Sequence, residues 1–469
     1  MHHVHASLAG VSPSSIRPVF RRHALSLCLS AALAAPLLAS QAFASPSSPQ
    51  NWVVKNCNDS GTDSLRDIIE NPMKAKTGDT VDLSQLAVPC GMADSTITLG
   101  SEIAVSQDDL TLNGPSNGSV TISAGGMSRV FHHTGAGTFA LFGLTVVDGY
   151  YHGAHDVYGG CIESDGGDVS LNHVTVSHCT AMSDIGYSNG AGVSAEFGNV
   201  TLIASKVTGN EAKIAANDLR SGFGGGVYSG GWTFAWYSSI SDNKADGGGT
   251  GGGVAAAGGG TFIASSVDNN ESGYGGGITT FSATTIIDCT ISQNEASVVG
   301  GGIYADYADS FQLANSTIAQ NKAGVIGGGI WFGGTPGAAT LTSNSSIIAN
   351  NNSAAANTPD DIYILAGYGT LAGADNLVIA SNVADPVVIT VTSDPKLGSL
   401  QFNGGPTKTL MLLPGSPAFG KGNTTGMFPS ITTDQRGPGY PRTSGPSASV
   451  DLGAVQFDSI FADGFNSPF

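Results

Sequence analysis

Residues 251–270 read GGGVAAAGGGTFIASSVDNN, and residues 275–294 read GGGITTFSATTIIDCTISQN. Both begin with a glycine cluster and an aliphatic residue, and both end with an aliphatic residue followed three positions later by asparagine. The glycine cluster occurs seven times, before Ile162, Val193, Val227, Val254, Ile278, Ile303 and Ile330. The second signature also occurs seven times, as Val176/Cys179, Val207/Asn210, Ile240/Asn243, Val267/Asn270, Ile291/Asn294, Ile318/Asn321 and Ile347/Asn350. The period of roughly 24 to 34 residues is typical of stacked repeat architectures.

The residues between the two signatures indicate strands. Runs such as Val169-Ser170-Leu171 and Thr261-Phe262-Ile263 alternate apolar and polar residues, which is the strand period. One repeat is too short to bury its own apolar face, so neighbouring repeats must stack and pair their strands in parallel. The sequence therefore predicts an all-β protein, a right-handed parallel β-helix.

The repeated asparagines have a structural explanation in such a solenoid. Asparagine tolerates the left-handed backbone conformation of tight turns, and amides at one position of every coil can stack as a ladder. We therefore predict a structural ladder rather than a ligand site for Asn210, Asn243, Asn270, Asn294, Asn321 and Asn350.

The composition limits the possible partners. Only 12% of residues are charged, and the formal net charge is −18. An acidic chain is not attracted to nucleic acid or to anionic membrane surfaces, so we expect no nucleic-acid partner. We also expect no transmembrane segment in the mature chain, no cofactor and a monomer.

The N-terminus has the features of a secretory signal. Arg17, Arg21 and Arg22 precede an apolar run over residues 25–38, and Ala42-Phe43-Ala44 matches a cleavage pattern. We expect residues 1–44 to be removed and the mature protein to be extracellular or at the cell surface, associated with the outer membrane.

Export favours disulfides among the five remaining cysteines. Cys57 and Cys90 flank the N-terminal element and are the predicted pair. Cys161 and Cys179 lie within one repeat, and the sequence leaves open whether they form a disulfide or are buried thiols. The odd number leaves at least one thiol, and the state of Cys289 is open too.

The flanking regions depart from the repeat. Residues 63–71 read as a short amphipathic helix with Asp63 or Ser64 as N-cap, which we expect to cap the solenoid. The loops before the glycine clusters are long early in the chain, at 150–158, 180–189 and 211–223, and short later. Long insertions on one side of a solenoid often form its functional face.

Several blocks resemble known families. The glycine clusters and the Ile-x-x-Asn signature resemble polymorphic outer membrane protein repeats and other pectin-lyase-like β-helices. The tail resembles a choice-of-anchor Q domain through five blocks in order: residues 394–398, 403–407, 413–418, 434–437 and 451–454. These resemblances imply the β-helix fold, export and surface retention. We accordingly divide the chain into 1–44 (signal peptide), 45–158 (N-terminal cap and irregular first coils), 159–351 (repeat coils), 352–456 (last coils and choice-of-anchor Q-like region with an irregular cap) and 457–469 (tail).

Catalytic chemistry is not evident in the sequence. Pectin-lyase-like folds host polysaccharide lyases, which use Arg or Lys near calcium-binding carboxylates, and glycosidases, which use paired carboxylates. Neither arrangement is recognisable here, so we assign no catalytic residue. The six mature histidines, with Asp156 nearby, have no diagnostic ligand spacing, so we predict no metal site; they are His132, His133, His152, His155, His173 and His178.

Aromatic residues are the candidate binding residues. Trp232, Phe234 and Trp236 alternate along one run and therefore share a strand face. The other candidates, Tyr228, Tyr304 and Trp331, each follow the aliphatic residue of a glycine cluster. An exposed aromatic face would bind sugars or a partner, whereas a covered one would be a satellite core. We expect a binding, adhesion or structural module for an extracellular glycan or a host or bacterial surface protein; the alternative is a carbohydrate-active enzyme, a lyase or glycoside hydrolase.

Overall fold

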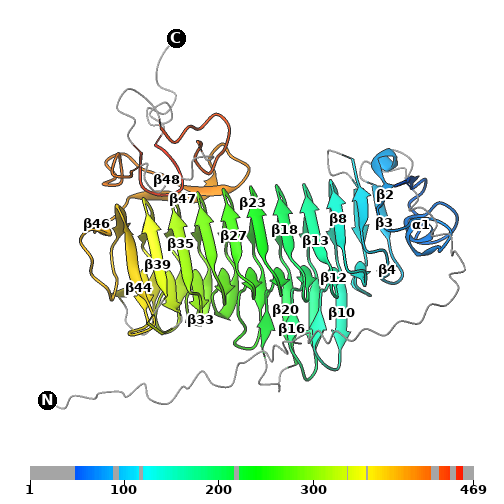
Figure 1. Cartoon of the computed structure of the whole chain (residues 1–469), viewed down its shortest axis with the longest axis horizontal. Helices are drawn as coiled ribbons and strands as arrows, with labels where there is room; N and C mark the ends of the chain where they lie inside the picture. Colours follow the sequence, from blue (N-terminus) through cyan, green and yellow to red (C-terminus); the bar gives the residue numbers. More distant parts are fainter. Residues whose placement is uncertain are drawn as a thin grey trace, which may run out of the picture. The chain divides into compact units, whose positions relative to one another are not determined.

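Four long sheets, named A to D below, form the solenoid (Figure 1). The computed structural model describes residues 48–87, 95–115, 120–215, 221–334, 336–337, 339–354, 358–423, 432–443 and 450–457. A complete coil contributes one strand to each sheet, in the order C, A, B, D; sheet D begins only with β10 (Tyr150–Gly153), so the first coils have no strand in it. Every pairing within sheets A, B and C is parallel, as in β18–β23–β27 (Val200–Ile203, Thr233–Trp236 and Gly260–Ile263). The predicted right-handed parallel β-helix is confirmed.

Sheets A and B have twelve strands each. The strands of sheet A are β1 (Asn51–Val53), β2 (Asp79–Asp82), β5 (Leu110–Asn113), β8 (Thr138–Phe142), β13 (Asp168–Asn172), β18, β23, β27, β31 (Thr284–Ile287), β35 (Ser310–Ala314), β39 (Thr340–Asn344) and β44 (Thr370–Ala374). The strands of sheet B are β3 (Ser95–Thr98), β6 (Val120–Ser123), β9 (Leu144–Val147), β14 (Thr175–Ser177), β19 (Lys206–Thr208), β24 (Ser239–Ser241), β28 (Ser266–Asp268), β32 (Thr290–Ser292), β36 (Thr317–Ala319), β40 (Ile347–Ala349), β45 (Asn376–Val378) and β46 (Ile389–Val391).

Sheets C and D meet at the glycine clusters. The strands of sheet C are β4 (Ile103–Val105), β7 (Phe131–His133), β12 (Ile162–Ser164), β17 (Val193–Ala195), β22 (Val227–Ser229), β26 (Val254–Ala256), β30 (Ile278–Thr280), β34 (Ile303–Asp306), β38 (Ile330–Gly333) and β43 (Ile362–Ile364). The strands of sheet D are β10 (Tyr150–Gly153), β15 (Thr180–Ser183), β20 (Glu211–Ile214), β25 (Lys244–Ala245), β29 (Glu271–Tyr274), β33 (Glu295–Val299), β37 (Lys322–Ala323), β41 (Asn352–Ser353) and β42 (Thr358–Pro359). The early insertions add a small parallel sheet of β11 (Val157–Tyr158), β16 (Ser188–Asn189) and β21 (Gly222–Phe223).

Both ends of the described chain carry additional structure. The helix α1 (Leu65–Glu70) buries Leu65, Ile68 and Ile69, and the Ser64 hydroxyl accepts a hydrogen bond from the Asp67 N–H as its N-cap. The 3₁₀ turn η1 (Ser84–Ala87) follows β2. An antiparallel hairpin, β47 (Leu397–Phe402) with β48 (Lys408–Leu412), lies beside the C-terminal coils (Figure 1). No helix in the described part of the chain is long and apolar enough to cross a membrane.

The core is a set of stacked aliphatic columns. The seven residues after the glycine clusters are register partners in sheet C, and each is fully buried. One coil alone could not exclude water from them, whereas each coil here covers the next. This stacking supplies the apolar burial that a repeat of this length lacks.

Each coil turns through left-handed residues. The first glycine of each cluster has positive φ, for example 61° at Gly275, and a Cβ there would lie 2.5 Å from the Ile278 carbonyl oxygen. In most coils non-glycine residues such as Tyr237 and Asn269 fill the turns between sheets A and B and between sheets B and D, whereas Gly143 and Gly209 fill two of them. Glycine is therefore required where a Cβ would collide with a backbone carbonyl, as at Gly275.

A continuous asparagine ladder runs beneath the corner between sheets B and D. Each buried amide accepts from the preceding asparagine of the row and donates to the next, as Asn270 Nδ2 does to Asn294 Oδ1 at 2.9 Å. In the last coil the ladder residue is Asn351, not Asn350. Asn350 has φ of 61° and occupies the left-handed turn one residue earlier, because β40 pairs Ile348, not Ile347, with Ile318.

A disulfide joins Cys161 and Cys179, which settles the alternative left open by the sequence. In the next coil Gly192 and Asn210 hold the equivalent positions, and a Cβ on Gly192 would lie 3.0 Å from the Asn210 amide nitrogen. The disulfide therefore occupies the place of one glycine–asparagine contact at the start of the ladder. Cys57 is also disulfide-bonded, but its predicted partner Cys90 lies outside the described residues, as does the predicted signal peptide.

Cys289 is a buried free thiol in a second ladder. In the turns between sheets A and B, backbone N–H groups donate to side chains of the next coil, including Ser238 to Ser265 Oγ at 3.1 Å and Cys289 to Ser316 Oγ at 3.1 Å. The Ser265 N–H correspondingly donates to Cys289 Sγ at 3.4 Å. Cys289 therefore holds a serine position of this ladder.

The C-terminal segment packs along the flank of sheet B. The fully buried Arg442 pairs with Asp288 and donates to the Asn315 carbonyl at 3.1 Å. Thr290 donates to Gln435 at 2.6 Å, and Lys408 pairs with Asp268 at 2.7 Å. The Ala454 N–H donates to Thr317 Oγ1 at 2.9 Å, so the blocks 434–437 and 451–454 each have a residue in direct contact with the coils.

Candidate functional site

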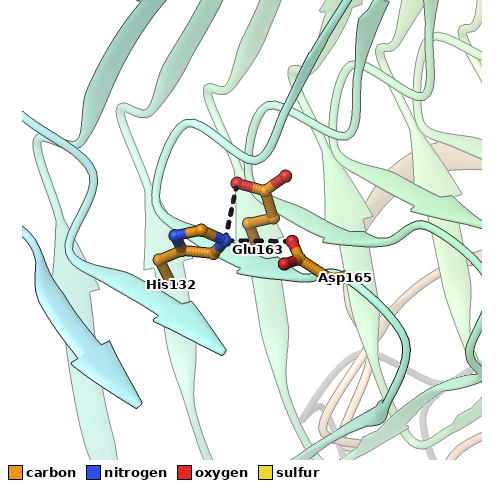
Figure 2. Close-up of side chains that lie close together, drawn as sticks. All are labelled: His132, Glu163 and Asp165. Carbon is orange, nitrogen blue, oxygen red and sulfur yellow. Dashed lines mark hydrogen bonds and ion pairs between the residues drawn. The ribbon is translucent and has the colours of Figure 1, made fainter. Parts of the chain in front are cut away.

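A cluster of ionisable side chains lies on the outer face of sheet C. His132 on β7 and Glu163 on β12 are register partners in adjacent coils, and Asp165 follows β12. Figure 2 shows the three side chains converging, with His132 Nε2 at 2.9 Å from Asp165 Oδ1 and 3.8 Å from Glu163 Oε2. Glu163 is 5% exposed. This His132–Glu163–Asp165 cluster is the strongest concentration of titratable groups on the described surface of sheet C.

Arg129 holds the Glu163 carboxylate in place through an ion pair. Its guanidinium pairs with the Glu163 carboxylate and with Glu102 Oε2 at 3.0 Å. The Tyr151 ring covers the guanidinium, with Cζ 3.3 Å from the ring centroid. Because the arginine is enclosed and doubly paired, it orients Glu163 and is not available to contact a substrate.

The pKa values of the cluster are raised, by neighbouring carboxylates at His132 and by burial at Glu163. A hydrogen bond to Glu102, together with Asp165 and the charge of Glu163, raises the pKa of His132 to about 9. Burial raises the pKa of Glu163 to about 7, against the opposing charge of Arg129. Burial also raises the pKa of Glu196, one coil further on. The cluster can therefore hold or release a proton near neutral pH, which is the range that general acid–base chemistry requires.

The other histidines do not join this cluster. His133 points into the core, where its ring contacts Ser164 Oγ at 2.9 Å and burial lowers its pKa. His152 forms an exposed pair with Asp184 at 2.7 Å. His173 and His178 occupy left-handed turns, and His155 is exposed near Asp156. The candidate set of six histidines therefore spreads over the core, the turns and the surface.

Three of the predicted aromatic binding residues pack against other rings. Tyr228, Tyr304 and Trp331 face outward from sheet C and are half-buried. Tyr304 and Trp331 stack with centroids 4.7 Å apart, and Tyr228 packs on Tyr158 at 6.0 Å. The Trp331 ring also extends over Gly333, where a Cβ would collide with it. All three are less exposed than Trp232 and Trp236, so we leave them out of the binding surface considered below.

The remaining three aromatics form an exposed patch on sheet A. Burial alternates along β23, where Thr233 and Ala235 are buried while Phe234 and Trp236 face outward. Trp236 is 43% exposed, with one ring face stacked on Tyr237 at a centroid distance of 5.4 Å, and Trp232 is 37% exposed. The half-buried Ile203 and Ile263 are the register partners of Trp236 on either side. We call Trp232, Phe234, Trp236, Ile203 and Ile263 the sheet A patch.

Comparisons with known proteins give only a fold likeness. No family model matches the chain, and no curated protein matches its sequence. Among solved structures, the chain resembles one described as the crystal structure of pectate lyase Pel9A, with a TM-score of 0.46 and 11% identity. The likeness covers 88% of this chain and 97% of that one.

Proposed function

We propose that this protein is an exported β-helix module that binds an extended polysaccharide across the sheet A patch. The observation that carries the proposal is a pair of exposed tryptophans at the two ends of one strand run. Trp232 and Trp236 are four residues apart, or about 13 Å at the rise of a strand. That separation suits a chain of sugar rings better than a single small ligand.

The surroundings of the patch fit a sugar chain. Trp232 lies against the next coil, because a Cβ added to Gly259 would be 3.0 Å from its ring. Thr201 and Thr261 flank Phe234 as its register partners and supply hydroxyl groups beside the rings. Aromatic rings with adjacent polar groups bind ligands that are themselves apolar on one face and polar at the edge.

Export to the cell surface or medium belongs to this proposal. It is supported by the signal-like N-terminus and by the Cys161–Cys179 disulfide, which an oxidising compartment favours. Retention through the choice-of-anchor Q-like region rests on the resemblance of its sequence blocks.

Binding is tested with a panel of neutral and acidic polysaccharides in affinity gel electrophoresis. The double variant Trp232→Ala/Trp236→Ala should lose at least tenfold in affinity for the retarding polysaccharide. Phe402→Ala is the matched control, since Phe402 is 60% exposed but lies outside the patch, on β47. Equal retardation of the double variant and the control would contradict the proposal, as would an unretarded wild-type protein.

The second candidate function is cleavage of a polysaccharide at the His132–Glu163–Asp165 cluster. One observation favours it: the pKa of Glu163 is raised to about 7 beside a second carboxylate, as a general acid requires. Incubation of the mature protein with the same panel, with and without calcium, tests it through new reducing ends and unsaturated products. Turnover that Glu163→Gln abolishes would establish this function; no turnover by the wild-type protein would reject it.

A further inference from the structure

The His132–Glu163–Asp165 cluster has the composition of a metal site. The three side chains offer one imidazole nitrogen and two carboxylate oxygens, all within 4.8 Å of one another. A metal with bonds near 2.1 Å separates neighbouring ligand atoms by roughly 3–4 Å. The separations of 2.9 and 3.8 Å from His132 Nε2 lie close to that range. Small side-chain rotations would therefore bring the three atoms to bonding distance of one ion.

A second observation concerns Ser194, at the neighbouring outward position of sheet C. Ser194 is the register partner of Glu163 in the next coil and faces the same side of sheet C. Its side chain is fully buried, and its Oγ has no hydrogen-bond partner among the described residues. A buried hydroxyl without a partner costs stability unless something polar is accommodated beside it. The hydroxyl therefore extends the row of polar groups that starts at His132 and Glu163.

The local charge suits a divalent ion. With His132 neutral, as a ligand must be, the carboxylates of Glu102, Glu163 and Asp165 and the guanidinium of Arg129 sum to 1 − 3 = −2. Arg129 orients Glu163 through the ion pair, and Glu102 lies 3.7 Å from His132 Nδ1, the other ring nitrogen. Metal-binding histidines are commonly oriented by a carboxylate at the second ring nitrogen.

We propose that His132, Glu163 and Asp165 bind one divalent first-row transition-metal ion on the outer face of sheet C. The imidazole nitrogen selects such ions over calcium and magnesium, which prefer oxygen ligands alone. The ion would link two adjacent coils, β7 and β12, at the side where the early insertions begin. This site is independent of the sheet A patch, which lies on another sheet.

Isothermal titration of the tag-free mature protein, first stripped with chelator, tests the proposal with Zn²⁺ and Mn²⁺ separately and with Ca²⁺ for comparison. We expect one equivalent of Zn²⁺ or Mn²⁺ to bind at least tenfold more tightly than Ca²⁺. Asp165→Asn and His132→Gln should each weaken that binding at least tenfold. Asp165 is 46% exposed at its side chain, so its amide variant should fold, and circular dichroism verifies this.

Asp184→Asn is the matched control. Asp184 forms a similar histidine–carboxylate pair with His152, at 2.7 Å and 48% side-chain exposure, without being part of the cluster. The control should bind the metal as the wild type does. If the wild type binds no stoichiometric metal ion, the proposal is overturned. The cluster would then be an ion-pair network in which a protonated His132 pairs with the carboxylates. Equal affinity of Asp165→Asn and wild type would overturn the proposal as well.

Discussion

Replacing Asn270 with leucine tests the asparagine ladder at its centre. Leucine keeps the size and the branching at Cγ but removes one donor group and one acceptor. The Asn270 side chain makes five hydrogen bonds, at 2.9 to 3.1 Å: to Asn243 N–H and Nδ2, to the Ile240 and Asp268 carbonyls, and to Asn294 Oδ1. All of them are buried, so water cannot replace the lost partner.

The expected loss in the free energy of unfolding follows from the polar groups that Asn270→Leu leaves without hydrogen-bond partners. The Asn243 backbone N–H donates to the Asn270 side-chain oxygen and loses that acceptor, and the Asn243 side-chain amide loses one of its two acceptors. An unsatisfied buried group costs about 1–3 kcal/mol, and the remaining groups retain other partners. We therefore expect Asn270→Leu to lower the free energy of unfolding by roughly 2–4 kcal/mol.

Guanidinium unfolding followed by circular dichroism measures the loss, and amide hydrogen exchange locates it. The control is Asn269→Gly, because Asn269 is exposed and has φ of 57°, which glycine adopts without strain. We expect the control to change stability by less than about 0.5 kcal/mol. Equal stability of the two variants, or unchanged exchange at Asn243, would refute the ladder as a stabilising element.

Three further predictions follow from the same contacts. Cys289→Ser should leave the melting temperature nearly unchanged, while Cys289→Val should lower it, because only serine continues the second ladder. Cys161→Gly/Cys179→Asn should be more stable in thermal unfolding than Cys161→Ala/Cys179→Ala, because the first pair reproduces the contact of the next coil. The stabilisation that His132 contributes should be complete below its ordinary pKa of 6.5 and vanish as the pH rises through about 9. The melting-temperature difference between wild type and His132→Gln should therefore shrink from pH 6 to pH 9, and a constant difference would contradict the raised pKa.

The fold could be predicted because the repeat specifies the register. A glycine cluster and an asparagine at a nearly fixed separation determine which residues stack, and Val254, Ile278 and Ile303 stack accordingly. The error at Asn350 came from two adjacent asparagines after two adjacent isoleucines. Either pair satisfied the spacing, and only the pairing of Ile318 with Ile348 distinguishes them.

The candidate metal site could not be recognised from local spacing. His132 lies 31 residues before Glu163 and 33 before Asp165, and no short motif joins them. A usable signal was nevertheless present: aligning Phe131-His132-His133 with Ile162-Glu163-Ser164 places His132 beside Glu163. The preceding coil lacks the glycine triplet, which is why the periodic pattern did not extend to His132. Among the six candidate aromatic residues, Tyr304 and Trp331 are half-buried because their rings stack across neighbouring strands. The sequence of a single strand does not specify such a contact.

The asparagine ladder ends differently on its two sides. At one end Cys179 donates its N–H to Asn210 Oδ1 and bonds covalently to Cys161, and at the other Asp361 accepts from the Asn351 amide at 2.9 Å. Asp361 also accepts from the Ala380 N–H at 2.9 Å. The ladder therefore ends on a carboxylate, which accepts the last amide's hydrogen bond and has no N–H of its own that needs a further acceptor. Because this buried row holds the register, the outward positions are free to vary without disturbing the stack. Trp232 and Trp236 of the sheet A patch occupy such exposed outward positions, whereas Glu163, although outward-facing, is 5% exposed and paired with the buried Arg129, so its replacement carries a structural cost as well.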